Sequence, residues 1–370
     1  MPFDVRDFPG APPEDRAGGR RNRRLVGGWL LAVCGMIGVM IVLGGVTRLT
    51  GSGLSIMEWA PIRGALPPMH EQEWQRLFDL YKKIPQYELL NAGFGIDGFK
   101  RIFWLEWTHR LWGRLIGIVF FVPLVWFGAT GRIERRLRVR LAVIFLLGGL
   151  QGAVGWFMVA SGFFPETTAV SPYRLVVHLG LALLLYATIF WTALGVLRPV
   201  GQADGVARWL RWLAGAVTVS VGITILAGGF VAGTHAGLDY NTFPLMDGHV
   251  IPKGYSDLSP FLRNWTENVA AVQFNHRLLA TLTAILALGT ALAAFSPMAR
   301  TASVPGVRPA VLALIGAVAL QYTLGVTTLL LVVPTPLAAT HQAVAVVVLT
   351  CALAFAHALR APRRHATRAR

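Results

Sequence analysis

The sequence predicts an all-α polytopic membrane protein with eight transmembrane helices. Its 370 residues are 54% hydrophobic and only 14% charged, with a mean hydropathy of +0.55, which is not the composition of a soluble globular protein. Eight apolar runs are long enough to cross a bilayer, which takes about 20 residues. The runs fall at 25–46, 109–131, 141–160, 174–197, 210–233, 276–299, 309–333 and 335–359.

The first 24 residues are rich in Pro, Gly and Arg, and we expect them to form a disordered cytoplasmic tail beside the lipid headgroups. The first apolar run is too long and too far from the N-terminus to be a cleavable signal peptide. It ends in a glycine-rich stretch at 44–55, and a loop of about 60 residues follows, which is long enough to be functional or partly structured. We expect short helices in this loop, lying over the outer face.

Lys and Arg are concentrated on alternate connections between the apolar runs. With the N-terminus inside, the inner segments hold 21 Lys and Arg, whereas the outer segments hold ten, of which seven lie in the long first loop beside seven acids. This is the positive-inside pattern, and it predicts that both termini are cytoplasmic. The distribution of Lys and Arg across the membrane therefore explains the net charge of +16. The lipid bilayer is an expected partner, and no nucleic-acid partner is expected.

The two cysteines, Cys34 and Cys351, each lie inside an apolar run. We expect no disulfide in an outer loop and no CxxC redox pair, and both thiols are interpreted as small packing residues.

The second half of the chain repeats motifs of the first half at nearly constant offsets. The matched pairs, with their offsets, are 43–54 and 227–238 (184), 108–111 and 275–278 (167), Gln151 and Gln321 (170), and His178 and His341 (163). Such offsets predict two four-helix halves descended from one unit, and an even number of helices in each half makes the repeat parallel. The predicted boundaries are a tail at 1–24, an N-terminal half at 25–197, a linker at 198–209, a C-terminal half at 210–359 and a cytoplasmic tail at 360–370.

Four histidines are expected near the outer ends of the inward-running helices. His109, His178, His276 and His341 each lie at or within about two turns of a predicted helix start. Two histidines on separate helices of one bundle are a common way to hold a haem iron from both faces. A zinc site is less favoured, because zinc prefers cysteine or carboxylate ligands and each half supplies only two histidines plus, in the first half, one carboxylate. Any one of these histidines is more simply explained by a hydrogen bond to a neighbouring helix, but the repetition at one depth favours ligation.

The segment 104–117 places several ionisable groups at the mouth of the second apolar run. On a helix, Glu106, His109 and Arg110 share one face. Charges inside a membrane helix cost about 2.5–3.5 kcal/mol each and usually mark a functional site, although a set of interfacial, snorkelling charges would give the same pattern. Arg110 and its counterpart Arg277 each follow a histidine, where they are placed to meet the propionates of a porphyrin.

The two halves differ at one position of this motif. Glu106 corresponds to Gln273, which suggests one site where chemistry occurs and one that only holds a cofactor, because a carboxylate can take a proton or stabilise positive charge and an amide cannot. Gly113 and Gly117 continue the stripe below His109 and are expected to leave bare backbone beside which a flat ligand can lie and exchange.

Five ordered motifs resemble the haem A synthase family, most closely its proteobacterial and mitochondrial branch. They are GGVTRLTGSGLS at 44–55, EWTHRLWGR at 106–114, AGLDYNTFPLM at 236–246, FNHR at 274–277 and THQ at 340–342. The resemblance covers nearly the whole chain, from 25 to 359.

This resemblance implies an oxidase that converts the C8 methyl group of haem O to a formyl group by two successive hydroxylations, after which the gem-diol loses water. It implies that the second half binds haem b with His276 and His341 as axial ligands. The first half then receives haem O at His109 and His178, with Glu106 as the catalytic carboxylate. Some branches of the family carry a cysteine pair in an outer loop as a proposed redox element, and this chain has none.

The resemblance also implies a place in the cell inner membrane, with the active sites towards the periplasm, and a possible handover from the farnesyltransferase that makes haem O. Gly-rich stripes on the first and fifth helices allow a homo-oligomer. A bis-histidine di-haem cytochrome b that exchanges electrons with a quinone is the main alternative, and a transporter is a weaker one because its ionisable groups would lie near the bilayer midplane. His235 lies in the repeated glycine-rich turn, but symmetry gives it no histidine partner.

Overall fold

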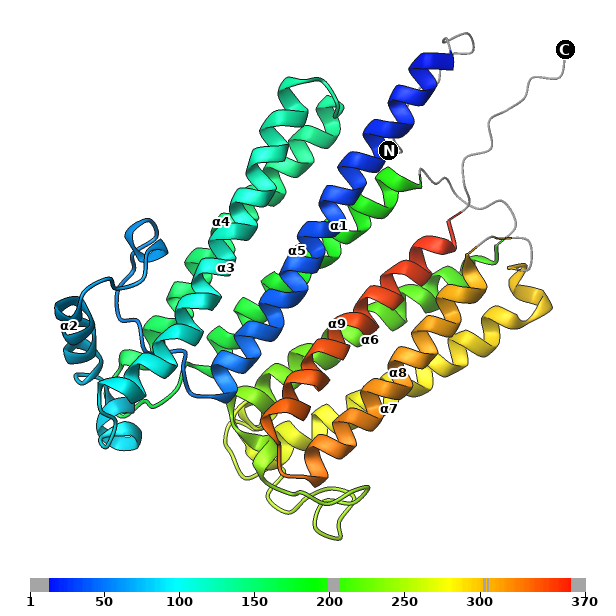
Figure 1. Cartoon of the computed structure of the whole chain (residues 1–370). Helices are drawn as coiled ribbons and strands as arrows, with labels where there is room; N and C mark the ends of the chain where they lie inside the picture. Colours follow the sequence, from blue (N-terminus) through cyan, green and yellow to red (C-terminus); the bar gives the residue numbers. More distant parts are fainter. Residues whose placement is uncertain (1–12, 199–205, 302–303, 305, 361–370) are drawn as a thin grey trace, which may run out of the picture.

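The computed structural model describes residues 13–198, 206–301, 304 and 306–360. In this part of the chain the regular elements are helices, apart from one isolated bridge between Met246 and His249. Eight of the described helices are long and apolar enough to cross a membrane (Figure 1). They are α1 (Pro13–Leu49), α3 (Ile96–Ala129), α4 (Arg135–Val159), α5 (Pro172–Leu197), α6 (Arg208–Gly233), α7 (Val269–Phe295), α8 (Val307–Leu330) and α9 (Thr335–Ala358). The prediction of an all-α protein with eight spans is confirmed, and the cytoplasmic position of the termini stays a prediction.

The long helices contact one another in two rings of the same order. In the N-terminal part α1 packs against α3 and α5, and α4 packs against the same two helices. In the C-terminal part α6 packs against α7 and α9, and α8 packs against the same two. The rings meet where α5 contacts α6 and α9 and where α1 contacts α9. Each contact has its counterpart when the two parts are exchanged, which is consistent with a duplicated unit, although common descent stays a prediction.

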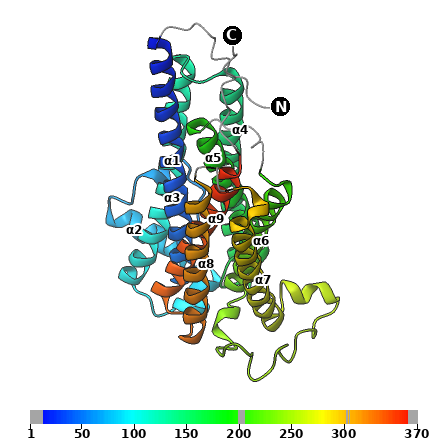
Figure 2. The same ribbon diagram turned by 90° about the vertical axis from the view of Figure 1, so that its right-hand side faces the viewer.

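Both long loops lie at the same end of the molecule. Figures 1 and 2 show α2 and the segment between α6 and α7 at the end opposite to the start of α1 and the end of α9. A second buried cluster, with Tyr81 and Phe99, lies under the first long loop. The core shared by both rings lies towards the other end and includes fully buried side chains from five helices: Leu30, Leu141, Leu210, Leu314 and Phe355. The four helix histidines lie outside this core, with side chains that are only partly buried. Packing therefore fixes the spacing of the helices at the end opposite to the long loops and is less tight around the imidazoles.

The long first loop contains short helices, as predicted. Its α2 (Glu71–Tyr81) lays an aromatic face on the first turns of α3, where the ring of Trp74 lies 4.8 Å from that of Phe103 and Phe78 lies 5.3 Å from Phe99. This contact explains why α3 begins at Ile96 and not near residue 109, where its apolar run was expected to start. Charged residues in the first turns of α3 lower the mean hydropathy, so the apolar run does not reveal these turns. The turns are stabilised by packing against α2, which is distant in the sequence.

The N-terminal tail is shorter than expected. The helix α1 begins at Pro13, a residue well suited to the first helical position, so the expected disorder of 1–24 is wrong for residues 13–24. Residues 1–12, most of the linker at 198–209 and all but Arg360 of the tail at 360–370 lie outside the described part of the chain.

Candidate functional site

Each ring carries two histidines on helices at opposite corners. His109 is on α3 and His178 is on α5, and each of these helices packs against both α1 and α4. His276 on α7 and His341 on α9 have the same relation to α6 and α8. The two histidine helices of each half therefore flank the same pair of helices, and the joint binding of one ligand by their imidazoles stays a prediction.

The depth of the four histidines is less uniform than predicted. His178, His276 and His341 lie six or seven residues after the starts of their helices, which agrees with the expected two turns. His109 lies thirteen residues after Ile96, nearly four turns in, so the expected position at the start of its helix is wrong. The reason is the extension of α3 beyond its apolar run, where it supports α2.

Glu106 is buried and fully engaged in hydrogen bonds. Only 2% of the residue is exposed. Its Oε2 accepts bonds from the backbone N–H of Ser55 at 2.7 Å, the hydroxyl of Ser55 at 2.7 Å and the backbone N–H of Ile56 at 2.9 Å. Its Oε1 accepts bonds from Nε and Nη2 of Arg110 at 3.0 and 2.6 Å. Arg110 in turn donates to the carbonyl oxygens of Ile56 and Glu58, so the acid and the base together hold the loop at 55–58 against α3.

Gln273 holds the equivalent loop of the second half in the same way. Its residue is 2% exposed, and its amide nitrogen donates to the carbonyl oxygens of Ala236 and Asp239. Its Oε1 accepts a bond from Arg277 at 2.7 Å. Arg277 also donates to the carbonyl oxygens of Tyr240 and Thr242, so the pair fastens the loop at 236–242 to α7.

The loops explain why Glu106 in the first half corresponds to Gln273 in the second half, which the sequence alone could not show. Glu106 meets backbone N–H donors, whereas Gln273 meets backbone carbonyl acceptors. A carboxylate only accepts hydrogen bonds and an amide nitrogen only donates, so each side chain matches the polarity of its own loop. One consequence is chemical: the first half keeps a buried negative charge beside His109, and the second half has no such charge at the matching position.

The glycines below His109 are not equally open. A Cβ at Gly113 would lie 3.2 Å from the methyl group of Met40 on α1, whereas a Cβ at Gly117 would meet nothing within 4 Å. The stripe expected beside a flat ligand is thus partly covered by α1 at Gly113.

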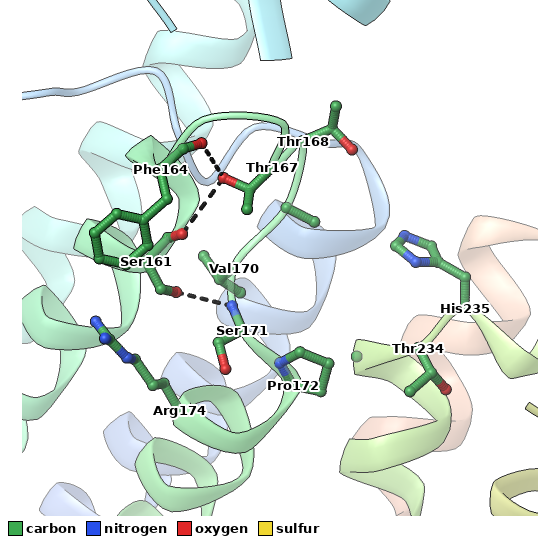
Figure 3. A pocket seen from close by; sticks show the side chains of 12 residues that line it. Ser161, Phe164, Thr167, Thr168, Val170, Ser171, Pro172, Arg174, Thr234 and His235 are labelled. Carbon is green, nitrogen blue, oxygen red and sulfur yellow. Dashed lines mark hydrogen bonds between the residues drawn. The ribbon is translucent and has the colours of Figure 1, made fainter. Parts of the chain in front are cut away.

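His235 lies apart from the four helix histidines. It follows α6 in a left-handed backbone conformation, with φ 58° and ψ 17°. It lines a cavity of about 540 Å³ between the outer ends of α5 and α6, and Figure 3 shows it across from Ser161, Phe164 and Arg174. Burial, and then the positive charge of Arg48, lower the pKa of His235. None of the four helix histidines is among the described residues lining this cavity.

Comparison with known proteins identifies the family. The family model COX15-CtaA, described as cytochrome oxidase assembly protein, matches residues 27–353. The chain belongs to the COX15-CtaA family. Among its relatives, the protein named heme A synthase of Granulibacter bethesdensis is 59% identical over 348 residues, which cover 94% of this chain and 91% of the relative. The heme A synthases of Nitrosospira multiformis and Rhodospirillum centenum are each 47% identical, covering 90% of this chain and 92% and 88% of the relatives.

The residues present in this COX15-CtaA chain fit a haem held by two histidines in each half. The Nδ1 atom of His178 is buried without a hydrogen-bond partner, so this ring keeps unused bonding capacity. Two imidazoles per half are the donor set of a six-coordinate haem iron. In the described ranges no three His, Cys, Asp or Glu side chains lie close enough to share a metal ion, so a zinc site of that kind is not assembled there.

Both cysteines are free, as expected from their positions. Cys34 is buried and Cys351 is partly buried. Two further arginines keep an unpaired donor: Arg114, which the motif at 106–114 already contained, and Arg48, which sequence reasoning missed. Arg48 has a buried Nη2 without a partner and Arg114 a buried Nη1 without one, so both keep a donor available near the outer end. An arginine inside the end of an apolar helix was the available signal for Arg48.

Proposed function

We propose that this chain is a haem A synthase, which oxidises the C8 methyl group of haem O to a formyl group. Relatives that carry this name at 45–59% identity over most of the chain support the proposal. The observation that carries it is the presence of one histidine pair in each of two equivalent helix rings. Such an arrangement offers one site for a resident haem and one for a haem that is itself the substrate.

The two pairs have different roles in this proposal. His109 and His178 hold the substrate haem O, because the buried charge of Glu106 lies one turn before His109 on the same helix. His276 and His341 hold haem b, beside the uncharged Gln273. Haem b, when bound, supplies a one-electron carrier. The reaction is an oxidation at a CH group, so the enzyme is an oxidoreductase of that class.

Glu106 is the carboxylate that we propose to act on the substrate. Its bonds with Ser55, Ile56 and Arg110 fix the side chain in one orientation and keep water from it. A negative charge held in this way stabilises positive charge that develops on the substrate, and it needs no reorganisation to do so. The same bonds leave it little freedom to swing as a proton carrier, so fixed electrostatic stabilisation is the role that its surroundings favour.

The arginines beside the histidines donate hydrogen bonds to the loops, and we propose that donors left over meet the propionates of the porphyrin. Arg277 keeps a buried Nε–H without a partner, and we propose that this donor meets a propionate of haem b. Arg110 uses its Nε, Nη1 and Nη2 on the loop at 55–58 and on Glu106. The unpartnered donors of Arg48 and Arg114 supplement Arg110 as candidates for the propionates of haem O.

The proposal places the enzyme in the cell inner membrane with both haem sites towards the periplasm, as the distribution of basic residues predicts. Haem O then arrives from the farnesyltransferase that makes it, and glycine-rich helix faces offer a surface for a homo-oligomer.

Extraction and mass identification of the pigments in purified protein test the function. We expect haem b together with haem O or haem A. Two haem b per chain, with no haem O or A, would instead indicate a di-haem cytochrome b, and protein that carries no haem after expression in a haem-replete host would refute both functions.

A further inference from the structure

Each of the four helix histidines rests against a glycine of the neighbouring helix. A Cβ built on Gly155 of α4 would lie 2.8 Å from Cε1 of His178, and one on Gly325 of α8 would lie 2.8 Å from Cε1 of His341. Ordinary contacts of a Cβ lie at 3.4–4 Å. The missing side chain therefore leaves a notch that the imidazole fills.

The same arrangement is found on the other side of each ring. A Cβ on Gly228 of α6 would lie 3.0 Å from Cε1 of His276, and one on Gly44 of α1 would lie 3.1 Å from Nε2 of His109. We call Gly44, Gly155, Gly228 and Gly325 the notch glycines. They follow the internal repeat, because Gly228 matches Gly44 at the offset of 184 and Gly325 matches Gly155 at the offset of 170 that also relates Gln321 to Gln151.

The notches serve the imidazoles and not the approach of helix backbones. For Gly155, Gly228 and Gly325 the three nearest heavy atoms outside their own helix surroundings all belong to the histidine ring. At Gly44 the only two atoms within 4 Å belong to His109. A glycine that allows close helix packing would instead show side-chain or backbone atoms of several residues.

A second observation points to the same seats. One turn before Gly155 and Gly325, the amides of Gln151 and Gln321 contact the same histidines: Gln151 donates to the carbonyl oxygen of His178 at 3.0 Å, and Nε2 of Gln321 lies 3.4 Å from Nε2 of His341. The Oε1 atoms of both glutamines are buried without a partner. Like the buried Nδ1 of His178, these acceptors are polar atoms beside a histidine ring that no described side chain pairs.

We propose that the notch glycines are positioning residues that hold the paired imidazoles back against the helix walls, so that the space between them has the width that a haem iron requires. This inference rests on the proposed function. An alanine at Gly325 would move the ring of His341 by at least about half an ångström, whereas metal–ligand distances tolerate only about 0.2 Å. Whatever its direction, a displacement of this size changes the position of the ring nitrogens by more than that tolerance.

The test compares alanine variants at notch and control positions of the same helix. Gly228→Ala and Gly325→Ala are matched by Gly222→Ala on α6 and Gly316→Ala on α8, where a Cβ meets nothing within 4 Å. Haem b per chain and the rate of haem transfer to apomyoglobin are measured on purified protein. We expect the notch variants to lose haem b about 10-fold faster or more, as for other residues that orient metal ligands, and the controls to match the unmodified chain.

The first half is tested in the same way with a different expected result. Gly44→Ala and Gly155→Ala, with Gly38→Ala and Gly152→Ala as controls, should retain haem b and bind added haem O about 10-fold more weakly. Notch variants that keep haem at the rate of their controls would overturn the inference, whereas failure of the unmodified chain and the controls to bind haem b would overturn the proposed function.

A double-mutant cycle of thermal stability, which needs no bound haem, tests whether Gly228 serves helix packing instead. In a His276→Ala background the ring that fills the notch is absent, so adding Gly228→Ala should not lower the thermal stability further. If the double variant is less stable than His276→Ala alone, Gly228 serves helix packing and the inference is wrong.

Discussion

Replacing Glu106 by Gln is predicted to stop formyl production and to leave haem b in place. The two carboxylate oxygens accept five hydrogen bonds, three from Ser55 and Ile56 and two from Arg110. An amide has one oxygen. If this oxygen takes the position of Oε2, the NH₂ group faces the guanidinium of Arg110. In the opposite orientation the NH₂ group faces the N–H donors of the loop.

The cost follows from the bonds that are lost. A hydrogen bond to a charged group contributes about 1.5–3 kcal/mol, and a buried donor left without a partner costs about 1–3 kcal/mol. Even in the better orientation, the three bonds from Ser55 and Ile56 are made to a neutral oxygen and each weakens by about 1 kcal/mol. The contact between α3 and the loop therefore loses about 3 kcal/mol, which corresponds to about 100-fold in the equilibrium for opening of the loop at 55–58. The second half keeps Gln273 and its loop, so its haem should be unaffected.

Two measurements on the same sample separate the consequences. Hydrogen exchange followed by mass spectrometry reports opening of the loop at 55–58, and pigment analysis reports haem A. Glu88→Gln is the matched control, because Glu88 is an exposed carboxylate of the same outer loop. The reciprocal variant Gln273→Glu places a carboxylate against the carbonyl oxygens of Ala236 and Asp239, so it should loosen that loop and the retention of haem b.

Two outcomes would refute this role of Glu106 or its loop. Haem A output at the level of the Glu88→Gln control would remove Glu106 from the mechanism. Loss of haem A with unchanged exchange at Ser55 and Ile56 would show that the charge acts directly and that the loop bonds are not needed to explain the defect.

The remaining predictions concern the second haem site and the outer loop. His276→Ala and His341→Ala should each abolish the low-spin b-type absorption spectrum of the purified protein, and an unchanged spectrum would mean that the ligands are wrongly assigned. Hydrogen bonds from Arg76 hold the pKa of Glu58 below its usual range, so the stabilisation by this pair is present at neutral pH and is lost as the pH falls through the lowered pKa. Hydrogen exchange over α2 should therefore rise on acidification, and Arg76→Gln should show the faster exchange already at neutral pH; α2 exchange that is independent of both changes would refute this role.

Hydropathy predicted the eight spans because soluble domains rarely contain an apolar run long enough to cross a bilayer. It failed at the start of α3, where Phe99 and Phe103 pack on Trp74 of α2 while charged neighbours lower the average hydropathy. The prediction of a disordered N-terminal tail was wrong for a similar reason, because composition does not show that a helix starting at Pro13 continues directly into the first span.

The repeat marks equivalent histidine positions in the sequence, but their surroundings could not be predicted. Two of the donors to Glu106 are backbone groups fifty residues away, and whether a loop presents N–H or carbonyl groups depends on its conformation and not on any residue type. The notch glycines were visible in the sequence only as members of glycine-rich stretches. Their contact with a ring on another helix appears only when α1, α4, α6 and α8 are placed beside the histidine helices.

The loop bonds also bear on how a duplicated scaffold acquires two different sites. A single exchange of Glu106 for Gln, or of Gln273 for Glu, leaves buried groups of like polarity facing each other, which costs more than either side chain gains. The acid and the amide are therefore each matched to the conformation of its own loop, at 55–58 and 236–242. Glu106 pairs its negative charge with Arg110, whereas the neutral Gln273 leaves the positive charge of Arg277 without a carboxylate, so the two matching positions differ in net charge although the helices around them are arranged alike.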